Sequence, residues 1–183
     1  MPKKIHLVCN AHLDPIWQWE WEEGAASALS TFKSASDLCD EFDYIFCHNE
    51  VTLYKYIEEY APELFEDIKR HIKEGKWKII GGWYLQPDCN MPCGESFVRQ
   101  LLLGKQFFRE EFGKDTRVLL LPDVFGYSAA LPQILKKSGI RHFVTSKISW
   151  NETNVLPVDC FLWEGIDGTE IFTNFITTQD YKG

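Results

Sequence analysis

Two kinds of hydrophobic pattern alternate along this chain. Short runs rich in Val, Ile and aromatic residues predict strands, and longer segments with apolar residues at three- and four-residue steps predict helices. The expected strands lie at about 5–11, 44–48, 77–84, 117–122, 142–146, 160–164 and 171–176. Because helical patterns fill several of the gaps, the sequence predicts an α/β fold of βα units on a parallel sheet.

The helical patterns differ in clarity. The strongest predicts one long amphipathic helix from Val51 to Glu74, ended by Gly75. A second helix is expected from about Glu95 to just before Gly113, and a third from Ser128, as N-cap, to Gly139. A less regular pattern over about 22–41 predicts a fourth.

Composition and charge exclude several classes of protein. Acidic residues outnumber basic ones by 27 to 19, and the lysines form no stripe that could neutralise phosphates, so nucleic acid is excluded as a partner. No apolar run approaches the roughly 20 residues needed to span a bilayer, which excludes a membrane protein. The N-terminus carries no secretory signal pattern, which favours a cytoplasmic location. The 183 residues suffice for one globular domain or part of one.

The six cysteines stand at irregular spacings, mostly within apolar runs, which indicates buried reduced thiols. Cys89 and Cys93 have the spacing of half a zinc site, but no second pair completes it. The end of the chain adds a further expectation. No helix pattern follows the strand at 171–176 to cover it, so we expect a piece of a longer protein.

Polar side chains follow five of the predicted strands. His12 and Asp14 come after the first, Asp123 after the fourth and Lys147 after the fifth. The second and third strands are followed by Asn49, Glu50 and Asp88. Working residues of parallel α/β folds gather at this carboxyl edge of the sheet, so these side chains are the candidates for a site.

Three of them suit a metal. His12 and Asp14 are two residues apart, so in an extended backbone they leave the same face, and Asp123 would join them from another strand. One imidazole and two carboxylates suit Zn²⁺ with an open position for substrate. Each residue also has a simpler interpretation: Asp14 as the N-cap before Pro15, His12 as a hydrogen-bonded strand-end residue, and Asp123 as a turn former.

Aromatic residues near the strand ends suggest sugar binding. Tryptophans crowd positions 17, 19 and 21, and Trp17 is the one expected in a pocket, while most others are expected in the core. Lys147 either holds a substrate oxygen, steadies Asp123 or is an exposed loop lysine. The other histidines lack partners at ligand spacing and are interpreted as structural: His6, His48, His71 and His142.

Several motifs together closely resemble one family. They are AHLDPIW at 11–17, GGW at 81–83 with PD at 87–88, GESFVRQL at 94–101, and LPDVFGYS at 121–128 with LPQIL at 131–135. In this order they resemble the N-terminal part of family 38 glycoside hydrolases, the zinc-dependent retaining α-mannosidases. SWNETN at 149–154 and WEGIDG at 163–168 are most similar to the cytosolic and bacterial branch.

The resemblance implies a fold, a reaction and roles. The fold would be part of an irregular (β/α) barrel, and residues 1–183 would be the N-terminal portion of a catalytic domain acting on terminal α-linked mannose in oligosaccharides. His12 and Asp14 match two zinc ligands, Asp123 matches the aspartate that binds zinc and attacks the anomeric carbon, and Trp17 matches a sugar-binding aromatic residue. Lys147 and Asp88 are further substrate-binding candidates.

The same resemblance places other parts of the site outside this chain. The family's fourth zinc ligand, a histidine, and its acid/base aspartate come from sequence beyond residue 183, so we expect the isolated chain to be inactive. Two other functions stay open. A carbohydrate deacetylase would need a zinc-bound water and usually an HxxxH motif, which is absent, and a sugar-binding module would keep the ligands without the chemistry. Linkage, the identity of the divalent metal and the oligomeric state, including a homo-oligomer, are not fixed by the residues.

Overall fold

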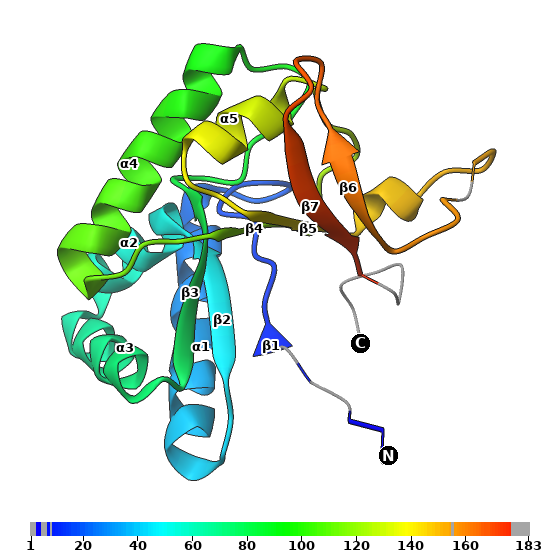
Figure 1. Ribbon diagram of the computed structural model, residues 1–183. Helices are drawn as coiled ribbons and strands as arrows, with labels where there is room; N and C mark the ends of the chain where they lie inside the picture. The colour runs from blue at the N-terminus through cyan, green and yellow to red at the C-terminus, as the bar shows by residue number, and fades with distance from the viewer. Residues whose placement is uncertain (1–2, 5–6, 8, 155, 177–183) are drawn as a thin grey trace. The chain divides into compact units, whose positions relative to one another are not determined.

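The computed structural model describes residues 3–4, 7, 9–154 and 156–176 and has a mixed α/β fold with parallel strands, as predicted (Figure 1). Most of the expected strand 5–11 lies outside the described residues. The chain divides into two compact units, residues 1–48 with 52–79 and residues 49–51 with 80–183. The division falls within two strands, so each unit is described in turn.

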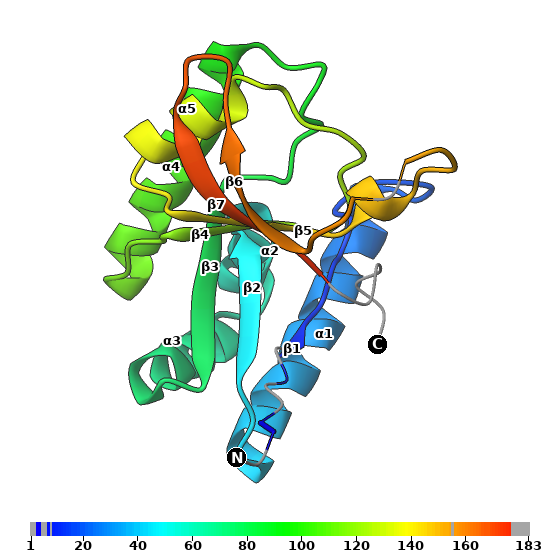
Figure 2. The same ribbon diagram turned by 45° about the vertical axis from the view of Figure 1, so that its right-hand side comes forward.

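The first unit contains helix α1 (Trp21–Glu41), α2 (Val51–Tyr60) and α3 (Pro62–Glu74), with α1 packed on α3. Its strands belong to a sheet of order β1-β2-β3, formed by β1 (Cys9–Asn10), β2 (Phe46–Glu50) and β3 (Trp77–Trp83). β1 pairs in parallel with β2, and β2 and β3 run side by side in Figures 1 and 2. This arrangement fixes the end of β1, where the first candidate residues follow.

Aromatic rings fill the core of the first unit. Phe32 lies edge-on to Tyr54 and Trp77 with ring centroids 5.2 and 5.4 Å apart. The Trp77 indole N–H donates to the Tyr54 hydroxyl at 2.8 Å, which satisfies a polar group that burial would otherwise leave costly. The core therefore joins α1, α2 and β3.

The prediction of one long helix over 51–74 was wrong. The helix is interrupted at Ala61, which has a non-helical backbone, and α3 restarts with Pro62 in its first turn. Proline removes a backbone donor and disfavours helical geometry in the residue before it, so the apolar period continues while the helix does not.

The second unit is built on a sheet of order β4-β5-β7-β6. Its strands are β4 (Val118–Leu121), β5 (His142–Thr145), β6 (Cys160–Glu164) and β7 (Glu170–Phe175). β4, β5 and β7 are parallel, but β6 runs antiparallel to β7 as the hairpin drawn in orange and red in Figure 1. The expected parallel βα pattern is therefore wrong for this last pair, since only a short turn separates the strands.

Helices α4 (Gly94–Phe112) and α5 (Leu131–Lys137) pack on this sheet through a core of buried apolar residues that includes Phe97, Leu101, Leu119, Leu135 and Phe143. α5 begins three residues later than expected. Ser128 is not its N-cap, because the helix starts at Leu131 and the Ser128 hydroxyl accepts only the Ala130 N–H at 3.3 Å.

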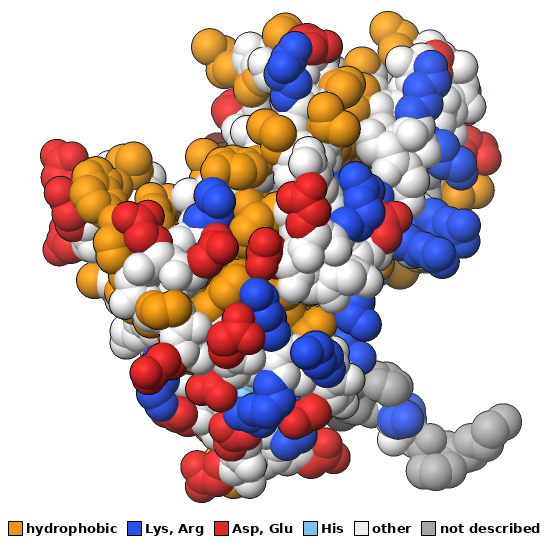
Figure 3. Space-filling model, turned by 90° about the vertical axis from the view of Figure 1, so that its left-hand side faces the viewer, with side chains coloured by type: hydrophobic (Ala, Val, Ile, Leu, Met, Phe, Trp, Pro, Cys, Tyr) orange, Lys and Arg blue, Asp and Glu red, His pale blue; other side chains and the backbone are white. Residues whose placement is uncertain are grey.

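On the face in Figure 3, acidic and basic side chains are interspersed. In the first unit, Arg70 forms two hydrogen bonds to Asp40, at 2.9 and 3.1 Å. None of the helices in the described part of the chain combines the length and apolar character that crossing a bilayer requires. The cysteines are free thiols, and three of the six are buried.

Candidate functional site

The end of β1 is held in place immediately before His12. The Asn10 side-chain amide donates to the Cys47 carbonyl at 2.8 Å, and the Cys47 thiol donates to the Cys9 carbonyl at 3.2 Å. These bonds reinforce the parallel register in which Cys9 faces Phe46. The chain then leaves the sheet from a fixed point, which limits where His12 can lie.

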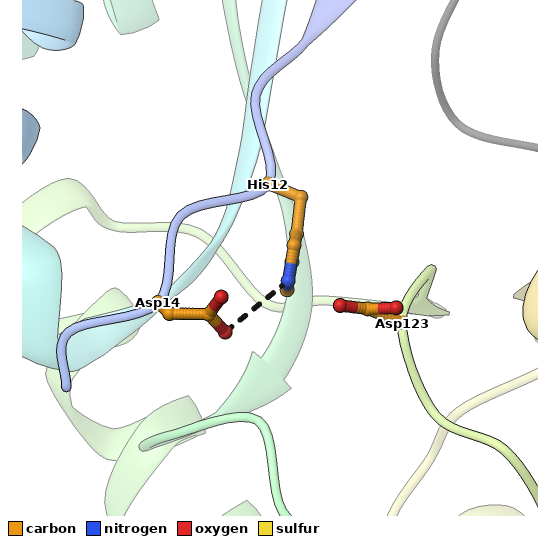
Figure 4. Close-up of side chains that lie close together, drawn as sticks. All are labelled: His12, Asp14 and Asp123. Carbon is orange, nitrogen blue, oxygen red and sulfur yellow. Dashed lines mark ion pairs between the residues drawn. The ribbon is translucent and has the colours of Figure 1, made fainter. Parts of the chain in front are cut away.

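His12 and Asp14 turn toward each other as their two-residue spacing predicts (Figure 4). His12 Nε2 lies 3.4 Å from Asp14 Oδ1, and the histidine side chain is almost buried whereas that of Asp14 is partly open to solvent. Two ligand atoms bound tetrahedrally to one zinc ion at about 2.1 Å are themselves separated by about 3.4 Å. The donor types and their separation therefore fit a zinc ion.

The alternative interpretation of Asp14 as a helix cap was wrong. α1 begins at Trp21 with Glu20 at the N-cap position, six residues after Pro15. Asp14 instead lies in a loop that the protein holds from two sides. The Trp19 indole N–H donates to the Asp14 carbonyl at 3.2 Å. On the other side, the loop lies directly against Gly24 of α1. The approach is so close that a Cβ added to Gly24 would lie 1.9 Å from the Pro15 carbonyl oxygen.

Sequence reasoning missed both of these supports. Trp19 was grouped with the core tryptophans, and only the crowding of Trp17, Trp19 and Trp21 into one short stretch marked the segment as unusual. Trp17 itself has a largely exposed ring that meets Trp19 edge-on at 5.3 Å between centroids. One large aromatic surface thus stands beside the Asp14 loop within the first unit.

The remaining histidines of the described chain lie in different surroundings, two of them buried and His142 exposed. His48 is fully buried against Phe32, and burial, which disfavours the charged form, is the main cause that lowers its pKa to about 3. His71 is buried beside the Ser36 hydroxyl, with 3.1 Å between Nε2 and Oγ, and His142 packs edge-on against Phe172. His6 lies outside the described residues.

Asp123, also labelled in Figure 4, belongs to the second unit, where the β4–β5 register determines its surroundings. Leu121 faces Thr145 in the parallel ladder, so the residues two positions further along each chain emerge at the same edge. These are Asp123 and Lys147, and Lys147 Nζ lies 3.3 Å from Asp123 Oδ1. Lys147 is only 5% exposed, which favours a contact with Asp123 over an exposed loop lysine.

A tyrosine fixes the loop that carries Asp123. The Tyr127 hydroxyl donates to the Val124 carbonyl at 3.0 Å, lies 3.3 Å from the Leu121 carbonyl and contacts the Thr145 hydroxyl. Burial raises the pKa of Tyr127, so the phenol stays protonated and able to donate. Sequence reasoning missed this residue, because nothing in the local pattern shows that a tyrosine folds back on its own loop.

The other strand-end residues act within the local backbone. Asp88 accepts the N–H groups of Asn90 and Met91 at 2.7 and 2.9 Å, and these bonds lower its carboxyl pKa. Buried Glu50 accepts the Gln86 N–H at 2.7 Å, and buried Asn49 donates to a backbone carbonyl of β4 at 3.1 Å. All three order connections around the strand ends.

A glycine lets β3 pass close to Asn49. Gly81 has a positive φ of 83°, and an added Cβ would lie 2.6 Å from the Asn49 carbonyl oxygen. Both the backbone conformation and the lack of space therefore require glycine at this position.

Comparison with known proteins gives one family. Residues 2–183 match the domain described as "Glycosyl hydrolases family 38 N-terminal domain". Alpha-mannosidase G of Dictyostelium discoideum is 38% identical over 180 residues, and the alpha-mannosidase of Saccharomyces cerevisiae is 35% identical over 179. The alignments cover 98% and 97% of this chain but only 17% and 16% of those proteins.

Among solved structures, an alpha-mannosidase from Enterococcus faecalis V583 matches with a TM-score of 0.78 and 22% identity, covering 93% of this chain and 20% of the other. At this identity the match concerns the fold. It agrees with the α/β architecture and extends over almost all of the chain.

Proposed function

This chain belongs to glycosyl hydrolase family 38, and we propose that the protein is a retaining α-mannosidase that removes terminal α-linked mannose from oligosaccharides. The observation that carries the proposal is the family match over residues 2–183, together with relatives of 35–38% identity that are named alpha-mannosidases. The chain spans about a sixth of the length of these relatives, so the activity is proposed for the whole protein.

We propose that His12, Asp14 and Asp123 hold a zinc ion. The fit of the His12–Asp14 pair to tetrahedral ligand spacing supports this, as does the combination of one imidazole with two carboxylates. A zinc ion held by these residues would supply a positive charge suited to bind and orient sugar hydroxyl groups. A carbohydrate deacetylase and a sugar-binding module are the competing functions, and the mannosidase relatives disfavour both.

In this proposal Asp123 is the nucleophile. One carboxylate oxygen forms a bond to the anomeric carbon while the bond from that carbon to the glycosidic oxygen breaks. The departing oxygen takes a proton from a carboxylic acid that the family supplies beyond residue 183. Water then attacks the anomeric carbon and gives its proton to the carboxylate left by that acid, while the bond to Asp123 breaks, and the two inversions give retention. The Lys147 ammonium at 3.3 Å fixes one oxygen of Asp123, and Tyr127 fixes its loop.

We propose three substrate-binding residues. The exposed face of Trp17 is suited to stack on the CH groups of a sugar ring. Lys147, which pairs with Asp123, is suited to donate to a sugar oxygen, and the exposed Asp88 to accept from a hydroxyl. We further propose that the isolated 183 residues do not turn over mannosides, because the family's acid/base group lies elsewhere in its sequence. A cytoplasmic location is a separate proposal.

Mutation of Asp123 tests the function directly. In the intact protein, Asp123→Asn should lower the turnover of a nitrophenyl α-mannoside on the order of 10⁴-fold, since the nucleophile is lost. In the wild type, an activated fluoromannoside that slows hydrolysis should label the peptide containing Asp123, identified by mass spectrometry. A label on another carboxylate would reject Asp123 as nucleophile. Retained sugar binding without any wild-type turnover would favour the binding module.

A further inference from the structure

The Lys147 ammonium is enclosed by an aromatic ring as well as by Asp123. Its Nζ lies 3.1 Å from the centroid of the Trp150 ring and 5.7 Å from that of Phe125. The two rings meet edge to face with 5.7 Å between centroids. The ammonium therefore has a carboxylate oxygen at 3.3 Å and an indole face even closer.

Local structure fixes the indole at this place. Lys147, Ile148 and Ser149 form the 3₁₀ turn η1 that follows β5, and the Trp150 N–H donates to the Lys147 carbonyl at 2.9 Å. The Ser149 hydroxyl donates to the Ser146 carbonyl at 3.0 Å and closes the same turn. A three-residue turn of this kind brings the side chain of Trp150 back over that of Lys147.

The exposures of the two residues are the reverse of what their chemistry favours. Trp150 is 60% exposed although it is the largest apolar side chain, whereas the lysine beneath it is 5% exposed. The tryptophan is absent from the buried core cluster of the second unit. Its position therefore contributes little burial of its own, whereas its ring covers the nearly buried Lys147 ammonium.

We propose that Trp150 is a positioning residue: its indole ring holds the Lys147 ammonium against Asp123 and thereby fixes the orientation of that carboxylate. The inference rests on the proposed role of Asp123 as nucleophile. A cation over an aromatic face is attracted by the ring quadrupole, and the attraction grows when water is excluded. Reorienting a nucleophile by a fraction of an ångström is costly, since attack needs a near-aligned geometry.

Two substitutions separate the aromatic face from simple bulk. In the intact protein, Trp150→Phe keeps a ring over Lys147, whereas Trp150→Leu keeps apolar volume without a quadrupole. We expect kcat on a nitrophenyl α-mannoside to fall about 10-fold for the leucine variant and less than about 3-fold for the phenylalanine variant. The loss should appear mainly in kcat, and any change in KM should not exceed that caused by Lys147→Met, because the ring reaches the substrate only through Lys147.

A double-mutant cycle tests whether Trp150 acts through Lys147. In a Lys147→Met background, Trp150→Leu should have no further effect on kcat, because the cation on which the ring acts is gone. Trp21→Leu is a matched control, since Trp21 is also exposed and stacks on another ring, Tyr60, with 6.4 Å between centroids. We expect this control to leave kcat unchanged.

Crystal structures of the two Trp150 variants provide a readout that does not depend on turnover. The phenylalanine variant should keep the Lys147 Nζ–Asp123 Oδ1 distance near 3.3 Å, and the leucine variant should release the ammonium. Equal effects of phenylalanine and leucine, an intact pair in the leucine variant, or additive losses in the Lys147→Met background would overturn the inference. A wild-type protein that cleaves no mannoside would refute the proposed function instead, and the structures alone would then decide about Trp150.

Discussion

At the Asp14 loop, two residues without catalytic chemistry determine where a candidate ligand lies. Trp19 binds the Asp14 carbonyl, and Gly24 leaves room for the Pro15 carbonyl against the start of α1. Residues that hold metal ligands in position commonly affect affinity about 10- to 100-fold when changed. The precision of the site thus depends on backbone contacts as well as on His12 and Asp14.

The substitution Gly24→Ala tests this dependence. The new Cβ would meet the Pro15 carbonyl oxygen at 1.9 Å, so the loop must move and carry Asp14 with it. We expect zinc affinity, measured by competition with a chromophoric chelator, to fall about 10- to 100-fold. Gly94→Ala is the matched control, because its Cβ would have no neighbour closer than 3.9 Å. Equal affinity in both variants would show that the Asp14 loop tolerates the shift.

Single residues could be assigned from the sequence only where their chemistry is local. The two-residue spacing of His12 and Asp14 after a strand was sufficient to predict that their side chains converge, and the structure places them 3.4 Å apart. Trp19 and Gly24 could not be assigned in this way. Their roles arise from contacts made after the chain has turned, and no periodicity records such contacts.

At the scale of elements, the register between β4 and β5 brings Asp123 and Lys147 together. The Tyr127 hydroxyl links the loop after β4 to Thr145 at the end of β5 and so reinforces that register. Two parallel strands with matched ends and one tyrosine between them therefore hold the nucleophile candidate.

Loss of the Tyr127 hydroxyl should measurably lower the stability of the protein. We expect Tyr127→Phe to destabilise the protein by about 1–3 kcal/mol, because the buried Val124 carbonyl and the Thr145 hydroxyl lose a partner. Urea denaturation monitored by circular dichroism measures the change. Thr145→Val should lower the free energy of unfolding by a similar amount. The double variant should lower it by less than the sum of the two single changes. Strict additivity would mean that the two hydroxyl groups do not act together.

Arg70 on α3 and Asp40 on α1 provide a pH-dependent contact between helices. The hydrogen bonds from Arg70, with its positive charge, lower the pKa of Asp40 below its usual value. A carboxyl whose pKa is lowered on folding adds stability above its unfolded pKa of about 4, and this stability is lost as the pH falls through the folded value. In Arg70→Gln, the Asp40 pKa followed by carboxyl-carbon NMR should rise. Lys73→Gln, a charge change on the same helix, should shift the Asp40 pKa less. An unchanged Asp40 pKa in Arg70→Gln would show that Arg70 is not the cause of the lowered value.

Element types followed from periodicity, but their interruptions and pairings did not. The period of apolar residues continues past Pro62, with Ile57, Leu64 and Ile68 all buried, so the break is marked by the proline alone. β6 and β7 each showed the composition of a strand, but their antiparallel pairing depends on the short turn at 165–169. Composition gives no direction to a strand.

At the scale of the whole molecule, the chain spans about a sixth of the length of the relatives that it matches. It covers 17% of its Dictyostelium relative and 16% of its yeast relative. The family could be predicted because several motifs occur in the family's order, and the α/β fold because strand and helix patterns alternate along the chain. Linkage preference and the acid/base group could not, because no residue pattern within these 183 residues identifies either of them.

The proposed zinc mannosidase is tested most directly by the hydrolysis of a nitrophenyl α-mannoside by the intact protein, measured before and after treatment with a chelator and again after addition of zinc. We expect nitrophenol release to stop when the metal is removed and to return with Zn²⁺, because His12, Asp14 and Asp123 are its proposed ligands. Hydrolysis that continues unchanged in the metal-free protein would contradict the proposed zinc site, and no hydrolysis under any of these conditions would contradict the mannosidase itself.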